Sequence, residues 1–526
     1  MERPRVYDGS GSAPYTTDVA VADGRVVAIG DLSDREAHER VSCEGLALAP
    51  GFIDVHSHTD ELWLANPLCE GKILQGVTTE IGGNCGTSVA PLFGAALERK
   101  RREARDHHVE LQWTTFDAFF TLVEREGVAL NVASLVGLGT TRSCVAGPDA
   151  RPLTKDEQEA QNRLVRGAIE EGALGVSSGL IYEPGRYAGI EELVACASAA
   201  RGAGAPLYAS HVRNEGDTVE AAIAEALTVG ERAQVGVQCS HHKAAGKKNW
   251  GKVHRTLAAI DRARSRGIDA ACDAYPYVAS WTELATVLPG WVREGGDDAA
   301  LERLRDPEAA LAAALAMELA RDPALGGDGW DTIMITGVAS ERNENLAGMR
   351  VDALAATWGL TPPRAVIRLL VEEEMRVHSV FFSMSEDDVA TVLSARFCCI
   401  GSDASARAFS GITARGVPHP RTYGTFPRVF GRYVRQRRVF DVAEAVRRMT
   451  ALPAALFGLR ERGLIAPGMF ADLVVFDDEH VVDRATYERP CVPPEGIRDV
   501  YVNGRAVVRG GTPTGARSGR VLRNGR

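Results

Sequence analysis

The stretch Gly51-Phe-Ile-Asp-Val-His-Ser-His58 decides the fold of this 526-residue chain. Residues 51–55 form a short apolar run, which is typical of a buried strand. Side chains at positions i and i+2 of an extended segment point to one face, so His56 and His58 can both reach a single metal ion. Two surface histidines after a strand would give the same pattern, so the stretch needs support from the rest of the chain.

Seven further apolar runs alternate with segments of helical periodicity, such as residues 156–171 and 217–232. This alternation predicts βα units around a parallel sheet. The eight runs lie at residues 51–55, 77–81, 132–136, 173–176, 206–209, 235–238, 269–272 and 397–400. Eight βα units predict a closed (β/α)8 barrel of the TIM type over residues 50–462.

The two ends of the chain predict a different structure. Residues 1–49 and 463–526 consist of short β-rich pieces separated by turns, and Asn503-Gly504 is a hairpin signal. We expect these ends to pair into one small β-sandwich domain. The gap between the seventh and eighth runs is too long for one helix, so residues 283–338 are predicted to form an inserted, lid-like subdomain over the mouth of the barrel.

The composition excludes several classes of protein. With 45% hydrophobic and 25% charged residues, the chain has the profile of a globular protein and not of a disordered or coiled-coil one. Its net charge of −10 argues against nucleic acid as a partner. The chain has no apolar stretch long enough for a membrane span, no secretory signal and no CxxC spacing among its ten cysteines, so we expect a soluble, cytoplasmic protein with reduced thiols.

Four more candidate metal ligands follow predicted strands: Cys85 in Asn84-Cys-Gly, His211, His241 in Ser240-His-His-Lys, and Asp403 in Gly401-Ser-Asp. The carboxyl ends of the strands converge on the active site of a TIM barrel. One buried thiol or histidine would be an ordinary core residue, but ligand side chains at five strand ends predict a metal site.

This donor set has a definite chemistry. A thiolate with two imidazoles suits Zn²⁺ and leaves a fourth position for water, which is the arrangement of a catalytic site. Zinc brings the pKa of that water to about 7, so a metal-bound hydroxide is available at neutral pH. Asp403 can then act as general base and afterwards as general acid.

Taken together, these motifs resemble those of the N-acyl-D-amino-acid deacylases (D-aminoacylases) of the amidohydrolase superfamily, and the resemblance covers nearly the whole chain. It also includes Asp273-Ala-Tyr-Pro-Tyr, His419-Pro-Arg and Gly424-Thr-Phe-Pro-Arg. The resemblance implies hydrolysis of a small-molecule N-acyl-D-amino acid to a D-amino acid and a carboxylate. It also implies two metal positions, in which Cys85, His211 and His241 hold one zinc tightly while His56, His58 and Asp403 form a weaker one.

The resemblance further implies a set of residues that bind the substrate's α-carboxylate: Lys243, Tyr275, Ser280 and Arg421. A guanidinium suits this task because it can form two parallel hydrogen bonds with a carboxylate. Without the resemblance, Lys243 would be interpreted as a solvated loop cation and Arg421 as part of a surface ion pair. Glu215 is expected to have a supporting role, and His242 to point away from the metal.

The chain departs from the family pattern in two places. Leu138 stands where a histidine is common, and the segment 404–418 is longer and differently composed. Both border the predicted pocket, so the preferred side chain and acyl group stay open, as does the oligomeric state.

Two other functions also stay open. Cyclic-amide hydrolases such as dihydroorotases and hydantoinases share the barrel and the HxH motif, but they usually bridge two metals with a carboxylated lysine on the fourth strand. Residues 173–179 contain no lysine. A metal-free, inactive scaffold would be expected to lose ligands, whereas this chain retains all six.

Overall fold

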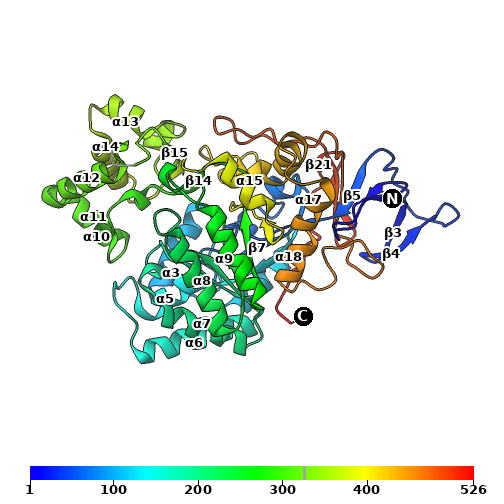
Figure 1. The fold of residues 1–526 in the computed structure, drawn as a ribbon, viewed down its shortest axis with the longest axis horizontal. Helices are drawn as coiled ribbons and strands as arrows, with labels where there is room; N and C mark the ends of the chain where they lie inside the picture. The colour runs from blue at the N-terminus through cyan, green and yellow to red at the C-terminus, as the bar shows by residue number, and fades with distance from the viewer. Residues whose placement is uncertain (324–326, 526) are drawn as a thin grey trace.

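Parallel strands that alternate with helices form the centre of the computed structural model, which describes residues 1–323 and 327–525 (Figure 1). These strands are β6 (Phe52–Asp54), β7 (Val77–Gly82), β8 (Asn131–Ser134), β9 (Val136–Gly137), β10 (Val176–Gly179), β11 (Leu207–His211), β12 (Gly236–Cys239), β13 (Ala270–Ala274) and β17 (Cys398–Ile400). Each predicted run overlaps one of them. The fourth strand begins only at Val176, because regular pairing with both of its neighbours starts at that residue.

The parallel strands pair in two sheets, with the orders β17-β13-β12-β11-β10-β9 and β6-β7-β8. On one side the sheets are joined through the chain, since only Leu135 separates β8 from β9. On the other side, Ser57 forms a parallel bridge with Ala404, and the amide of Asp403 donates a hydrogen bond to the carbonyl of His56 (2.8 Å). The ends of β6 and β17 therefore lie side by side.

Helices flank the parallel strands, as Figure 1 shows for α3 and α5 to α9. They are α1 (Leu62–Ala65), α2 (Glu70–Ile73), α3 (Gly94–Asp106), α4 (Phe116–Glu126), α5 (Leu138–Ala146), α6 (Lys155–Glu170), α7 (Ile190–Gly202), α8 (Val219–Ala233), α9 (Val253–Ser265), α15 (Glu386–Ser394), α16 (Arg421–Arg428), α17 (Val442–Met449) and α18 (Ala451–Leu456). The helices predicted at 156–171 and 217–232 are confirmed as α6 and α8. A capping box of Thr154 and Glu157 starts α6 by satisfying amides that have no partner inside the helix.

Strands from both ends of the chain form a separate, seven-stranded sheet of order β2-β1-β5-β18-β19-β20-β21. Its members are β1 (Arg5–Val6), β2 (Tyr15–Thr16), β5 (Ala47–Pro50), β18 (Leu473–Phe476), β19 (Ile497–Val502), β20 (Arg505–Arg509) and β21 (Thr512–Pro513), and the hairpin of β3 (Asp18–Ala22) and β4 (Arg25–Gly30) lies beside it in Figure 1. The predicted hairpin turn is confirmed: Asn503 and Gly504 connect β19 to β20, both with positive φ.

Residues 280–381, between β13 and α15, form a separate cluster of elements at the upper left of Figure 1. It contains an antiparallel sheet of order β14-β16-β15, with β14 (Ser280–Glu283), β15 (Ile333–Val338) and β16 (Val377–Phe381), and the helices α10 (Gly290–Arg293), α11 (Asp297–Arg305), α12 (Pro307–Arg321), α13 (Val351–Trp358) and α14 (Pro362–Glu372). Residues 284–377 contribute to a hydrophobic core of its own. This core extends past residue 338, the predicted end of the insertion.

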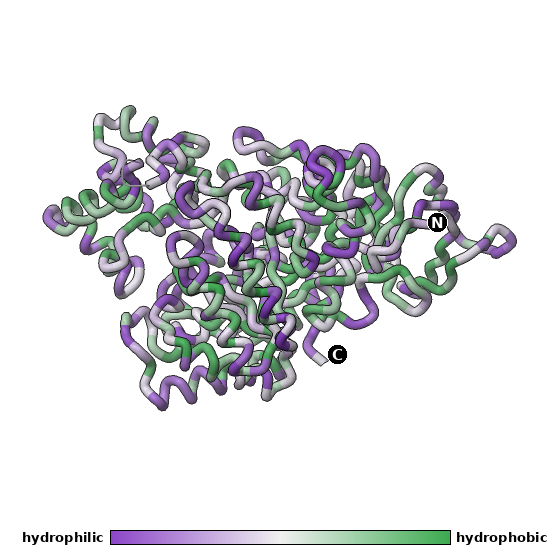
Figure 2. Tube along the Cα trace, in the orientation of Figure 1, coloured by the Kyte–Doolittle hydropathy of each residue, from purple (hydrophilic) through white to green (hydrophobic). Residues whose placement is uncertain are grey.

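Within the described residues no helix is both long and apolar enough to cross a membrane. Figure 2 shows hydrophobic residues along α12, where Leu311, Leu315 and Leu319 are exposed. All ten cysteines are free thiols, and most of them are buried.

Candidate metal centre and catalytic cavity

The structure brings all six predicted metal ligands together at the carboxyl ends of the parallel strands. His56 and His58 follow β6, Cys85 follows β7, His211 ends β11, His241 follows β12 and Asp403 follows β17. They form two groups whose ligand atoms lie within 4.8 Å of one another: His56, His58, Cys85 and Asp403, and then Cys85, His211 and His241. Cys85 belongs to both groups, so its sulfur lies between two candidate metal positions.

The backbone at this centre is held in an uncommon conformation. Cys85, His241 and Asp403 have φ values of 53°, 34° and 53°, in a region that residues other than glycine seldom occupy. Such strain persists where the surroundings impose it, and it is concentrated at functional sites. The turns after β7, β12 and β17 thus aim one ligand each at the same point.

Protonation at the centre suits metal binding. Burial opposes ionisation of the Cys85 thiol, but the adjacent His56 and His241 outweigh it and hold its pKa well below its usual range. Burial lowers the pKa of His211, which favours the neutral imidazole that a metal requires. Both ring nitrogens of His211 are buried without a hydrogen-bond partner among the described residues. A buried imidazole without partners next to a thiolate fits a Zn²⁺ ligand set.

Two carboxylates orient the histidines from behind. Asp273 lies 3.2 Å from Nδ1 of His56 and accepts a hydrogen bond from the amide of His241 (2.8 Å). Glu215 lies 2.9 Å from Nδ1 of His241. Lys243 Nζ lies 2.8 Å from the same nitrogen of His241. A carboxylate that accepts a proton from Nδ1 of a metal-binding histidine leaves Nε2 free for the metal, and Asp273 is placed for this role at His56. The predicted supporting role of Glu215 agrees with this geometry. No role was predicted for Asp273 from the sequence.

A fully buried lysine connects the strands that carry His56, His58 and Asp403. Lys72 Nζ contacts the carboxylates of Asp54 (2.6 Å) and Glu80 (2.9 Å). It also donates to the carbonyl of Ala404 (2.8 Å), next to Asp403. Sequence reasoning missed this residue, since the only signal was the rarity of lysine in the chain.

Three of the predicted substrate-binding residues form a compact group. The guanidinium of Arg421 lies 4.6 Å from the centre of the Tyr275 ring, and the ammonium of Lys243 lies 5.6 Å from it. Lys243 pairs with Glu215, and Nη1 of Arg421 lies 2.9 Å from Oδ2 of Asp403. Both cations are buried, so they are neither a solvated loop cation nor a surface ion pair.

Arg421 begins α16 and is held in place by a buried histidine. Nδ1 of His419 accepts a hydrogen bond from the amide of Arg421 (3.0 Å), and its Nε2 faces the carbonyl of Ala279 (3.0 Å). Burial lowers the pKa of His419 well below its usual value, so this imidazole is neutral. The motif at His419 therefore positions the arginine, a role that the sequence did not reveal.

The metal-ligand groups face a cavity of about 700 Å³. Every predicted site residue except the fully buried His56 lines it, and Ser280 does so at the start of β14. The insertion contributes further lining at Trp281, Glu283 and Arg293. The cavity thus lies between the strand ends and the inserted segment.

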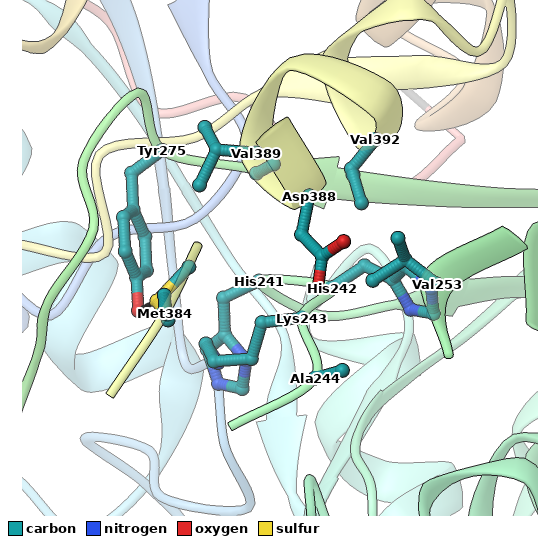
Figure 3. A pocket seen from close by; sticks show the side chains of 11 residues that line it. His241, His242, Lys243, Ala244, Val253, Tyr275, Met384, Asp388, Val389 and Val392 are labelled. Carbon is teal, nitrogen blue, oxygen red and sulfur yellow. Dashed lines mark hydrogen bonds between the residues drawn. The ribbon is translucent and has the colours of Figure 1, made fainter. Parts of the chain in front are cut away.

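A much smaller cavity of about 10 Å³ lies behind Lys243. Figure 3 shows His241 and Lys243 beside Tyr275, while the ring of His242 is turned toward Val253. Nε2 of His242 lies 2.8 Å from the hydroxyl of Thr256, which agrees with its predicted orientation away from the metal.

The two departures from the family pattern differ in their relation to the large cavity. Leu138 is buried at the start of α5 and is not among the residues that line it. Ala404, Ser405 and Arg407, from the segment 404–418, do line it.

Parallel strands with imidazole, thiolate and carboxylate side chains gathered at their carboxyl ends define a metal-dependent hydrolase. The chain belongs to the amidohydrolase family, whose model matches residues 39–508. It is 38% identical over 522 residues to an N-acyl-D-glutamate deacylase of Alcaligenes xylosoxydans xylosoxydans, which covers 98% of this chain and 95% of the relative. A D-aminoacylase of the same organism is 36% identical over 521 residues, with 98% and 96% covered.

A solved structure extends this similarity to three dimensions. The N-acyl-D-glutamate deacylase of Bordetella bronchiseptica, crystallised with zinc and a phosphonate inhibitor that mimics the tetrahedral intermediate, superposes with a TM-score of 0.83. The two chains are 35% identical, and the match covers 99% of this chain and 98% of the other. The amidohydrolase fold expected from the sequence is confirmed.

Proposed function

We propose that this protein hydrolyses the amide bond of N-acyl-D-amino acids and releases a D-amino acid and a carboxylate. One observation carries the proposal: Arg421, which suits a carboxylate, lies 2.9 Å from Asp403, which suits proton transfer beside a metal. Recognition of an α-carboxylate and cleavage of the adjacent amide would then occur within one cavity. The names of the similar deacylases support both the D configuration and the acyl group.

The scaffold we propose is a closed (β/α)8 barrel over residues 50–462. The meeting of β6 and β17 at the Ser57–Ala404 bridge supports closure. We further propose that residues 1–49 and 463–526 are a small β domain, and that 283–338 belongs to a lid over the cavity.

The residues present fit zinc. Cys85, His211 and His241 would hold the tighter ion, and His56, His58 and Asp403 a second, weaker one. When bound, Zn²⁺ polarises an amide carbonyl and lowers the pKa of water to about 7.

Asp403 would move the proton. Its pKa is held well below its usual range, because the charges of Arg421, His241 and His56 outweigh the effect of burial. The carboxylate is therefore ionised and can accept a proton from the attacking water. The water oxygen bonds to the carbonyl carbon, the C–N bond breaks, and Asp403 returns the proton to the leaving nitrogen.

Arg421, Lys243 and Tyr275 would hold the α-carboxylate, with Ser280 as a further donor on the cavity wall. Lys243 is kept charged in spite of its burial, since Glu215 raises its pKa. Two buried cations at one aromatic ring form a site for an anion.

Cyclic-amide hydrolysis is disfavoured, because β10 carries no lysine that could bridge two metals. The retention of all six ligands in one place disfavours a metal-free scaffold.

Turnover of paired N-acetyl-D- and N-acetyl-L-amino acids tests the proposal, with the α-carboxylate either free or masked as an amide. We expect cleavage of the D acids only. Arg421→Met should lower kcat/KM for the free acid by about 10- to 1,000-fold more than for the masked substrate, because the loss of the cation beside Asp403 affects both substrates alike. If kcat/KM falls equally for both substrates, Arg421 does not recognise the α-carboxylate. Equal turnover of D and L acids would reject the D-aminoacylase assignment.

A further inference from the structure

Among the described residues, one cation in the catalytic cavity has no carboxylate partner. Among the lysines and arginines that line the cavity, six have a carboxylate within 4.0 Å: Arg99, Lys100, Arg102, Lys243, Arg293 and Arg421. Arg407 has none within the described parts of the chain. Its Nε is buried and has no hydrogen-bond partner there, and its Nη1 donates to the carbonyl of Arg415 (3.0 Å). Arg407 is half-buried, so its guanidinium is partly removed from water without the anion that each of the other six cations has beside it.

Arg407 is close to the group proposed to bind the α-carboxylate. Its guanidinium carbon lies 5.5 Å from the centre of the Trp281 ring, and that of Arg421 lies 5.9 Å from the same ring. The two carbons are therefore at most about 11 Å apart, the sum of these distances, which a dicarboxylate held by a guanidinium at each end can span.

The position of this arginine is fixed before any ligand binds. Its carbonyl accepts a hydrogen bond from the amide of Gly71 (2.9 Å). The Trp281 indole is held by its own hydrogen bond to the hydroxyl of Thr336 (2.8 Å). A binding group that is ordered in advance loses little entropy when the ligand arrives.

The charged groups beside Arg407 differ from those beside Arg99. His378 lies near Arg407 on β16, and its ring centre lies 5.9 Å from that of Trp281, the ring that Arg407 also faces. Glu283 pairs with His378 across the sheet, but its charge acts on Arg99, which also pairs with Glu103. These two carboxylates thus act on Arg99, whereas Arg407 has none within 4.0 Å among the described residues.

On the basis of the proposed function, we infer that Arg407 binds a second carboxylate of the substrate, so that the preferred N-acyl-D-amino acid is a dianion. That carboxylate has two sources, an acidic side chain such as that of D-glutamate or D-aspartate, or the free end of a dicarboxylic acyl group such as succinyl. Because Arg407 lies in the segment 404–418, this inference gives the altered loop a role in specificity.

Substrate pairs that are matched in shape and differ in charge distinguish the two sources. N-acetyl-D-glutamate is compared with N-acetyl-D-glutamine, and N-succinyl-D-leucine with N-succinamoyl-D-leucine, since each pair differs only in the second charge. The wild type should favour the charged member of one pair by about 10- to 100-fold in kcat/KM, and Arg407→Gln should abolish that preference while sparing the neutral member.

Arg415→Gln is the matched control. It removes the same charge from the same loop, but Arg415 is exposed and does not line the cavity, so the preference should persist. Should Arg407→Gln fail to fold, Arg407→Lys keeps the charge and should still prefer the dianion.

Three outcomes would overturn the inference: wild-type kcat/KM values equal within each pair, equal losses for charged and neutral substrates in Arg407→Gln, or the same change in Arg415→Gln. If the wild type cleaves none of the substrates, the proposed function fails. Carboxylate binding by Arg407 can then still be tested by calorimetric titration of N-acetyl-D-glutamate and N-succinyl-D-leucine into the wild type and Arg407→Gln. Loss of affinity for one of the two ligands in the variant supports the inference, and unchanged affinities overturn it.

Discussion

Lys72→Met should destabilise the protein through the charges that it leaves behind. Lys72, Asp54 and Glu80 are all completely buried, and Nζ contacts the two carboxylates at 2.6 and 2.9 Å. Methionine fills a similar volume but cannot pair with them. Breaking a buried ion pair by removing one partner costs about 3 to 5 kcal/mol, and here two carboxylates lose their cation.

The same change should weaken metal binding. Lys72 donates to the carbonyl of Ala404, next to Asp403, and it orients Asp54, which accepts from the amide of Ser402 (2.8 Å). Without these contacts the ends of β6 and β17 separate more easily, so the second metal position should lose occupancy first.

Urea unfolding followed by fluorescence, together with zinc analysis of the folded protein, measures both effects. Lys100→Met is the control, since it also removes a buried lysine from two carboxylates (Glu61 at 3.1 Å, Glu103 at 2.7 Å) but lies on α3. It should lower stability while zinc content stays unchanged. Adding Asp54→Asn and Glu80→Gln to Lys72→Met should recover much of the lost stability, because no uncompensated charge is left. An unchanged unfolding midpoint in Lys72→Met would refute the reasoning.

Three further predictions address the site. Cys85→Ala should lose most of its zinc and nearly all activity, because its sulfur is the ligand shared by both groups; full zinc content by elemental analysis would show that the assignment is wrong. Asp403→Asn should lower kcat by at least about 10²-fold while the tightly bound zinc stays, and near-normal turnover with metal bound would exclude Asp403 as the base. The segment 283–338 should be cleaved more slowly by a protease when product or inhibitor is bound, since its residues line the cavity; equal cleavage rates would argue against a moving lid.

Much of the fold follows from local pattern. Apolar runs and helical periodicity located the parallel strands, and Asn503-Gly504 located a hairpin, because both signals depend on residues that are near neighbours in the chain. The first and last residues of the elements were predicted less accurately. The fourth strand begins where its two neighbours offer hydrogen bonds, and the core of the insertion extends past residue 338 because β15 pairs with β16 from a distant part of the chain.

The candidate metal ligands were also accessible from the sequence. Each of them ends or follows a strand, and the carboxyl ends of parallel strands meet at one edge, so His56, Cys85 and His211 could be grouped without coordinates. The residues that support these ligands could not be found from the sequence. Asp273, His419 and Lys72 act through partners that no local spacing indicates, and Ser402 is separated from Lys72 by 330 positions.

The sequence by itself therefore determined the class of fold, the candidate ligand set and the family resemblance, because these depend on periodicity and on short motifs. Only the tertiary structure decided which charges are compensated. Six cations of the cavity have carboxylates beside them, whereas Arg407 faces the indole of Trp281 and the carbonyl of Arg415. The energy of a buried charge depends on every group within a few ångströms, and folding brings those groups together from distant parts of the chain.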